Sequence, residues 1–290
     1  MNPNYDVLDD EGLIRWRFKP TIIEAPQSVL LAHARQAFEN AKRHFEQSRA
    51  FSALEMTVSE RFWMEHIPLT NHVCFGTGSV TTGSDKSICM AQLAVFVVIV
   101  ELLQRHQPGN ARPPMYAQDP KYNSLDKALL ASLHIKYVEH PEGFRLVDPQ
   151  TFAYSAVPPS FVARGIMVRD PAIYMIDNTL QLWRNPDQAE KRAQFFTYFP
   201  EDFPNEKLTE EQQKARMEQD EIKAGAIVDK FLTDKEKFHM PQYLPAFNNP
   251  VEPGSREISP LYMFWAEPSE GGMSAMMRQM ALRGSAAQLV

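Results

Sequence analysis

Short apolar runs alternate with longer amphipathic stretches along the first two thirds of this 290-residue chain. The short runs are rich in Val, Ile, Phe and Tyr, and most of them end at Gly, Pro, Asp or Asn, which is typical of buried strands. They predict five strands, at residues 72–75, 115–118, 135–138, 152–157 and 172–176.

Apolar residues at helical spacing predict four helices in the same region, at residues 26–49, 58–66, 85–107 and 125–133. We expect Ser84 and Ser124 to provide the N-caps of the third and fourth helices, because a serine hydroxyl can accept a bond from a free backbone N–H of the first turn. The third helix is apolar on nearly all sides between residues 91 and 103, which predicts that it is buried.

Strands that alternate with helices are typical of βαβ units and a mainly parallel sheet. We therefore predict an α/β fold, a Rossmann-like three-layer domain with N-terminal helices packed on it. Beyond residue 185 the pattern changes. Residues 209–238 are highly charged and predict a solvent-facing helix, and residues 240–272 are rich in Pro, Gly and aromatics and predict an extended arm. The expected organisation is an N-terminal arm and helix (1–60), the Rossmann-like domain (61–185) and a helical and irregular C-terminal extension that wraps the same core (186–290).

Composition narrows the class of protein. The formal net charge of -6 argues against a broad nucleic-acid surface. The two cysteines, Cys74 and Cys89, make neither a disulfide framework nor a zinc site, and we expect both to be buried core thiols. The acidic N-terminus is unlike a signal peptide, and the longest apolar run, AVFVVIV, is far short of the roughly 20 residues of a membrane span. We expect a protein of the cytoplasm or nucleus, not associated with membranes.

The turn after the first strand is the first candidate site. Residues 72–84 read HVCFGTGSVTTGS, in which the apolar run gives way to three glycines and five hydroxyl residues. Backbone N–H groups of such a turn can hold an anion at the start of the next helix, which makes Gly76, Thr77, Gly78 and Ser79 candidate cofactor-binding residues. The spacing fits neither G-x-G-x-x-G nor a Walker A loop. The alternative is a tight turn that needs glycine because its φ angles are positive.

Polar residues at other strand ends complete the candidate site. Asp119 follows the second strand, where a carboxylate often receives a ribose hydroxyl. Asp177 and Asn178 follow the fifth strand and are candidates for a general base and a substrate-orienting amide, to which Tyr154 and Ser155 add hydroxyls. Each aspartate or asparagine has an alternative role as a helix cap or turn residue. Metal-binding motifs such as H-E-x-x-H do not occur, nor does G-x-S-x-G.

Six short motifs follow one another along the chain: C-F-G-T-G-S at 74–79, Q-L-A at 92–94, D-P at 119–120, L-D-K at 125–127, V-D-P at 147–149 and P-P at 158–159. In this order the chain resembles, between about residues 60 and 180, the SRR1-like domain family, named for a plant protein of red-light signalling and circadian timing. The resemblance implies a Rossmann-like α/β domain and a fungal-type intracellular protein. The family has been tied to transcriptional or clock regulation and, in animals, to haem.

Two stretches qualify this resemblance. Family members tend to carry Met-Pro-His-Cys after the fourth strand, whereas residues 155–159 read S-A-V-P-P here, which weakens any metal or haem role. The segment D-N-T-L-Q at 177–181 has the spacing of the D-D-x-x-E motif of fungal arginine-containing cyclodipeptide synthases. Two of the three acids of that motif are amides here.

Three functions follow as hypotheses. The first is a Rossmann-like group-transfer enzyme for a small-molecule substrate, with S-adenosylmethionine as the leading cofactor candidate because the glycine spacing does not fit the dinucleotide fingerprint. The second is a non-catalytic regulator that binds a protein partner through the C-terminal extension, which predicts an exposed apolar patch. The third is a fungal enzyme of secondary metabolism related to aminoacyl-tRNA-dependent cyclodipeptide synthases, which would make tRNA the one nucleic-acid partner.

Overall fold

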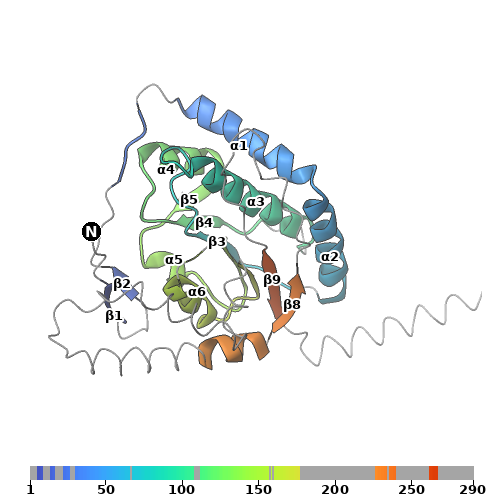
Figure 1. The fold of residues 1–290 in the computed structure, drawn as a ribbon. Helices are drawn as coiled ribbons and strands as arrows, with labels where there is room; N and C mark the ends of the chain where they lie inside the picture. The colour runs from blue at the N-terminus through green and yellow to red at the C-terminus, as the bar shows by residue number, and fades with distance from the viewer. Residues whose placement is uncertain are drawn as a thin grey trace, which may run out of the picture.

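The structure is a computed structural model that describes residues 5–8, 14–16, 22–26, 30–65, 67–107, 112–156, 158, 160–176, 226–233, 235–239 and 261–266. A seven-stranded sheet with helices on both faces forms its centre (Figure 1). The strands of this sheet are β3 (Asn71–Phe75), β4 (Met115–Gln118), β5 (Ile135–Tyr137), β6 (Thr151–Ser155), β7 (Ile173–Ile176), β8 (Lys235–His239) and β9 (Tyr262–Ala266). A separate antiparallel pair joins β1 (Tyr5–Leu8) to β2 (Ile14–Trp16).

The order across the sheet is β5-β4-β3-β6-β7-β9-β8. Five adjacent strands, β5, β4, β3, β6 and β7, are parallel to one another. Strand β9 runs antiparallel to both of its neighbours, β7 and β8. All five predicted strands are present, each within two residues of its predicted ends. The predicted α/β fold with a mainly parallel sheet is therefore confirmed.

One face of the sheet is covered by α1 (Leu31–Glu46), α2 (Arg49–Glu65), α3 (Lys86–Arg105) and α4 (Ser124–Ser132). The other face is covered by α5 (Glu142–Arg145), α6 (Ser160–Met167) and a helix at 226–233. Side chains alternate between the two cores along each strand, as the pleat requires. In β3, for example, Cys74 packs under α3 while Val73 and Phe75 pack under α5 and α6.

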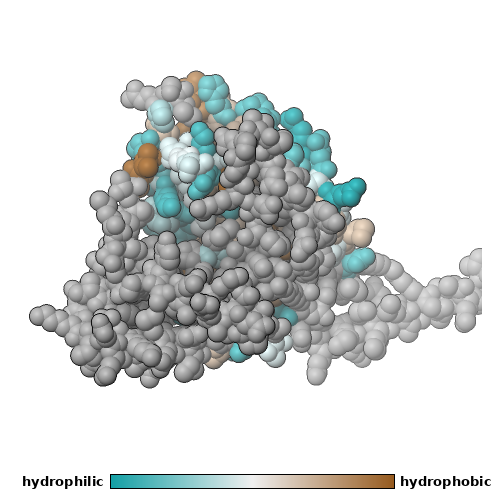
Figure 2. Space-filling model, viewed as in Figure 1, coloured by the Kyte–Doolittle hydropathy of each residue, from teal (hydrophilic) through white to brown (hydrophobic). Residues whose placement is uncertain are grey.

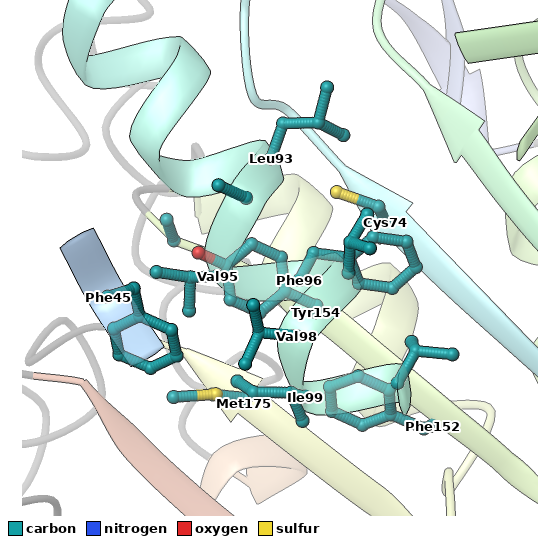
Figure 3. Packing of buried hydrophobic residues seen from close by; sticks show 14 of the residues in the cluster. Phe45, Cys74, Leu93, Val95, Phe96, Val98, Ile99, Phe152, Tyr154 and Met175 are labelled. Atoms are coloured by element: carbon teal, nitrogen blue, oxygen red, sulfur yellow. The ribbon is translucent and has the colours of Figure 1, made fainter. Parts of the chain in front are cut away.

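Helix α3 is the central core element. Its residues Phe96 and Ile99 pack toward β6 and β7, with the Phe96 ring stacked on Phe152 at 6.0 Å between centroids (Figure 3). Helix α1 covers its outer side (Figure 1). By length and composition alone α3 could cross a membrane, but it is mostly buried inside the protein. This confirms the prediction of a buried helix and agrees with a core role.

Both predicted helix caps are wrong. The N-cap of α3 is Asp85, not Ser84, and its side chain makes no capping hydrogen bond. The N-cap of α4 is Asn123, not Ser124. The Asn123 side chain accepts from the backbone N–H of Asp126, whose carboxylate accepts from the backbone N–H of Asn123 in return. This reciprocal pair satisfies two N–H groups at once. A cap at Ser124 could not form such a pair, because the residue three positions later is Lys127, whose side chain has no acceptor.

The C-terminal part of the chain also departs from prediction. Residues 235–238, predicted as the end of a charged helix, lie in strand β8. Strand β9, predicted as part of an extended arm, lies inside the sheet between β7 and β8. Its apolar run is buried against both cores, with Met263 and Trp265 on the α3 side and Phe264 on the α6 side. Helices α5 and α6 were not predicted. The domain boundaries at residues 60 and 185 stay predictions.

Candidate functional site

The described connections between β3 and β7 create a topological switch point. The chain runs from β3 through α3 to β4 and then through α4 to β5 on one face, whereas it runs from β6 through α6 to β7 on the other. Strands β3 and β6 are neighbours in the sheet. The loop after β3 leads to a helix on one face and the loop after β6 leads to a helix on the other, so the two loops diverge at this point. Ligands of open α/β sheets bind at such a point, outside the carboxyl ends of the strands. We call the carboxyl ends of β3, β4 and β6 with their following loops the switch-point edge.

The glycine turn forms the β3 side of the switch-point edge. Gly76, Gly78 and Gly83 have φ angles of 67°, 75° and 90°, which confirms the predicted need for glycine at these positions. A Cβ atom on Gly76 would meet no atom of the described residues within 4 Å, whereas one on Gly78 would lie 2.9 Å from Sγ of Cys89. The backbone is therefore open at Gly76 and closely packed at Gly78.

Asp119 lies directly against this turn. One carboxylate oxygen accepts from the backbone N–H of Gly78 at 2.7 Å, and the other accepts from the backbone N–H of Lys121 at 2.7 Å. The residue is 5% exposed, and burial raises the pKa of its carboxyl while the two backbone hydrogen bonds oppose that rise. The structure thus brings together two of the predicted cofactor-binding residues. Each oxygen retains a lone pair beyond the bond it makes to the backbone.

A second carboxylate, Asp126, holds the rest of the turn and was not predicted as a site residue. It is fully buried and accepts from the backbone N–H groups of Val80 at 3.1 Å, Thr81 at 3.0 Å and Asn123 at 2.9 Å. It also accepts from the hydroxyl groups of Ser79 and Thr81, each at 2.7 Å. The sequence signal was the N-x-x-D spacing of a capping box at 123–126.

The side chains of Thr77 and Ser79 are both occupied by hydrogen bonds within the protein. The Thr77 hydroxyl is 2.5 Å from the Tyr122 hydroxyl, and both residues are buried. Ser79 donates to Asp126, as described above. These two predicted cofactor-binding residues therefore order the turn through their side chains, and their contribution to a ligand would come from the backbone.

An N-terminal strap, residues 22–26, crosses the outside of the turn. The carbonyl oxygen of Ile23 accepts from Asn123 Nδ2 at 3.1 Å and from the Thr82 hydroxyl at 3.3 Å. The Glu24 carboxylate accepts from the hydroxyl and the backbone N–H of Ser124 at the start of α4, and these bonds lower the pKa of Glu24. The predicted first helix starts at residue 31 instead of 26, and residues 22–26 form no helix.

Two of the predicted catalytic residues, Tyr154 and Ser155, lie on opposite faces of the sheet. Tyr154 is buried on the α3 side, 5.8 Å from the ring of Phe96, and its hydroxyl has no hydrogen-bond partner among the described residues. Ser155 is buried on the opposite side, where its hydroxyl is 2.8 Å from that of Tyr174. Asp177 and Asn178 lie outside the described residues, so their role stays a prediction. The described part of the chain has no cluster of three His, Cys, Asp or Glu side chains that could bind a metal ion.

Both cysteines were predicted to be buried core thiols. Cys74 is fully buried in β3. Cys89, in the first turn of α3, is only partly buried and packs against Gly78. Burial raises the pKa of the Cys89 thiol to about 11, with the nearby Asp119 adding to the rise, which favours the protonated thiol over the nucleophilic thiolate at neutral pH.

Comparison with known proteins identifies the family. A search of curated proteins and a search of solved structures gave no significant match. The model of the SRR1 domain matches residues 33–250, well over half of the 290 residues. The matched range includes the glycine turn, Asp119 and the strands β3 to β8. The chain therefore belongs to the SRR1 domain family.

Proposed function

We propose that this protein is a small-molecule group-transfer enzyme that binds a nucleoside-containing ligand at the switch-point edge, with S-adenosylmethionine as the leading candidate. The observation that carries the proposal is the juxtaposition of Gly76, Gly78 and Asp119 where β3 and β4 end. In nucleotide-binding sheets the turn after the first strand approaches the ligand closely, and an acid after the second strand receives the ribose hydroxyls. Gly76 and Asp119 hold these two positions.

The strand order supports the same class of ligand. The parallel strands, in the spatial order β5-β4-β3-β6-β7, correspond to strands 3-2-1-4-5 of dinucleotide-binding sheets. The sheet then continues with β9, antiparallel to both neighbours, followed by β8. An antiparallel strand inserted at this place is typical of S-adenosylmethionine-dependent methyltransferases, which is a fold-level analogy. It favours that cofactor over a dinucleotide, in agreement with the glycine spacing.

Thermal unfolding with and without S-adenosylhomocysteine near 1 mM tests the proposal. A ligand present at about 100 times its dissociation constant adds roughly 2.7 kcal/mol, which raises the midpoint of a protein of this size by about 5–10 °C. We expect this shift in the wild type. The same midpoint with and without ligand would contradict the proposal.

Two glycine variants supply matched controls. Gly76→Ala and Gly83→Ala both place a Cβ at a positive φ in open space, so both should lower stability by about 1–2 kcal/mol. Only the Cβ at residue 76 would project where the ligand approaches. We expect the ligand-induced shift to disappear in Gly76→Ala and persist in Gly83→Ala, and equal shifts in the two variants would place the ligand elsewhere.

A non-catalytic regulatory protein is the second candidate, and one observation favours it. The carboxylates of Asp119 and Asp126 both bind backbone N–H groups of the turn, which is a structural role complete in itself. A partner surface of this kind would be an exposed apolar patch. On the described part of the face in Figure 2 the hydrophobic residues are few and lie apart.

The tRNA-dependent hypothesis rests on residues 177–181, which lie outside the described residues.

A further inference from the structure

The N-terminal strap, residues 22–26, is held to the body of the protein by polar contacts. Every strap residue except Ala25 is exposed, and Ile22 and Ile23 are 45% and 64% exposed. Burial of apolar surface therefore contributes little to the attachment. The hydrogen bonds between the strap and the described residues end on two of its groups, the carbonyl oxygen of Ile23 and the carboxylate of Glu24.

The two donors that bind the Ile23 carbonyl have other acceptors within the protein. The Thr82 hydroxyl lies 2.7 Å from the hydroxyl oxygen of Ser79, which is an alternative acceptor for it. The Asn123 amide, which donates to Ile23, also donates to the hydroxyl oxygen of Thr81 at 3.0 Å. Detachment of the strap thus leaves neither donor without a partner, so it does not incur the cost of an unsatisfied polar group.

The backbone of the glycine turn is held by a buried group that the strap does not contact. The backbone N–H groups of Val80 and Thr81 donate to the carboxylate of Asp126, which is fully buried. The Glu24 carboxylate, by contrast, accepts from the hydroxyl and the backbone N–H of Ser124, and both residues are exposed. Water can replace a lost partner at an exposed hydrogen bond but not at a buried one. The contact between Glu24 and Ser124 is therefore the weaker of the two attachments.

The strap and the turn thus differ in what holds them. Segments that bury few apolar contacts and depend on exposed hydrogen bonds open at a lower free energy than the core of a protein. We propose that the strap detaches from the glycine turn and reattaches as one unit while the turn keeps its fold, with the contact between Glu24 and Ser124 as its latch. Detachment uncovers the Thr82 hydroxyl and the first backbone N–H group of α4 on the outer side of the turn. This opening requires no ligand, so it is independent of the proposed function.

NMR relaxation of the backbone ¹⁵N nuclei tests the latch in the absence of any ligand. Glu24→Ala removes the acceptor of both Ser124 donors, so we expect the order parameters of the strap to fall together below about 0.6 while those of the glycine turn stay at about 0.85. Glu39→Ala, on the exposed side of α1, removes the same charge and should change neither set. A strap that stays ordered in Glu24→Ala would show that Glu24 is not its latch.

Amide hydrogen exchange measures whether the turn opens together with the strap. The Ser124 amide donates across the latch, whereas the amides of Val80 and Thr81 donate to the buried carboxylate. After correction for intrinsic rates, we expect Ser124 to exchange at least about tenfold faster than the other two in the wild type. In Glu24→Ala the Ser124 rate should rise further, while the rates of Val80 and Thr81 change by less than about twofold. Equal acceleration of all three amides would mean that the strap and the turn open together, which would overturn the proposal.

A change of charge at Ser124 tests the same latch from the other side. Ser124→Asp places a carboxylate against that of Glu24, and the two like charges repel, although an acid in the first turn favours the helix itself. We expect this variant to release the strap with α4 intact, and we expect added salt to restore part of the attachment by screening the repulsion. Ser124→Ala is the control, because it keeps the backbone N–H bond to Glu24 and should leave the strap more ordered than Ser124→Asp does. Equal order of the strap in the two variants would contradict the role given to this contact.

Discussion

At the scale of single residues, the carboxyl groups of Asp126 and Asp119 hold the glycine turn in its conformation. Asp126 accepts three backbone N–H groups and two hydroxyls although it is fully buried, and Asp119 accepts two further N–H groups. A buried polar group is tolerated when hydrogen bonds within the protein replace those it would make to water. The turn therefore depends on these two side chains for its conformation, whatever ligand it binds.

Asp126→Asn should lower the free energy of unfolding by about 2–4 kcal/mol, because the amide NH2 cannot accept the N–H and hydroxyl groups that now face a carboxylate oxygen. Urea denaturation measures this change. Asp85→Asn is the matched control, since Asp85 is exposed at the other end of the same turn and should cost less than about 0.5 kcal/mol. Equal effects of the two substitutions would contradict the role assigned to Asp126.

His72 predicts a pH dependence of stability. It is fully buried in β3, neither ring nitrogen has a hydrogen-bond partner among the described residues, and burial lowers its pKa to about 3. Its ordinary pKa in the unfolded chain is about 6.5, so below that pH protons bind the unfolded state and not the folded one. Stability contributed by neutral His72 is complete above pH 6.5 and is lost as the pH falls toward 3.

The variant His72→Phe should remove this dependence and keep the packing against Phe152. Between pH 6.5 and pH 5 the free energy of unfolding of the wild type should fall relative to the variant by roughly 1.5–2 kcal/mol. Urea denaturation at several pH values measures the difference. Parallel curves for the two proteins would show that His72 titrates normally in the folded state.

At the scale of elements, the glycine turn and the start of α4 are linked by hydrogen bonds into one unit. Asn123 caps α4, its amide donates to the Ile23 carbonyl of the strap, and Asp126 links α4 to the turn. The strap, the glycine turn and α4 therefore meet at a single pair of residues. A substitution of Asn123 should therefore destabilise the strap, the glycine turn and α4 together.

Asn123→Ala should cost about 1–2 kcal/mol, the value of a lost N-cap, because the backbone N–H of Asp126 loses its acceptor. Ser124→Ala removes only the exposed bond to Glu24 and should cost about 0.5 kcal/mol or less. Thermal unfolding of both variants makes the comparison. A larger effect of Ser124→Ala would restore the sequence-based assignment of Ser124 as the cap.

Sequence patterns predicted the elements whose signal is local. The five parallel strands and α3 are continuous apolar runs between turn residues, and such runs are visible without a structure. The capping pair at Asn123 and Asp126 was missed because Ser124 is an equally good N-cap by residue type. Strand β9 was missed because its place depends on pairing with β7, about ninety residues earlier in the chain. The contact between Nε2 of Gln118, in β4, and Nδ1 of His140, at 3.3 Å, likewise exists only in the folded chain.

Closure of the sheet by distant segments is the main feature at the scale of the whole molecule. Strand β9 lies between β7 and β8, so a segment near residue 265 bridges the parallel part of the sheet to its far edge. Phe264 packs on Phe231 of the helix at 226–233, with 5.7 Å between ring centroids. The C-terminal segment is thus part of the fold that positions the switch-point edge.

A chain that ends at residue 250, where the family match ends, should not fold cooperatively, because β7 and β8 both lose their partner. Phe264→Ala in the full chain is the milder test and should cost about 3–5 kcal/mol. Near-ultraviolet circular dichroism during heating measures both. A shortened chain with the wild-type midpoint would show that β9 is dispensable.

The most direct test of the central claim is to locate a ligand on the protein. Backbone amide NMR spectra recorded during titration with S-adenosylhomocysteine would report which residues it touches. Binding at the switch-point edge predicts saturable shifts of the amides of Gly76, Gly78 and the residues around Asp119, with little change in α1 and α2. No shifts at 1 mM ligand, or shifts confined to another surface, would contradict the account.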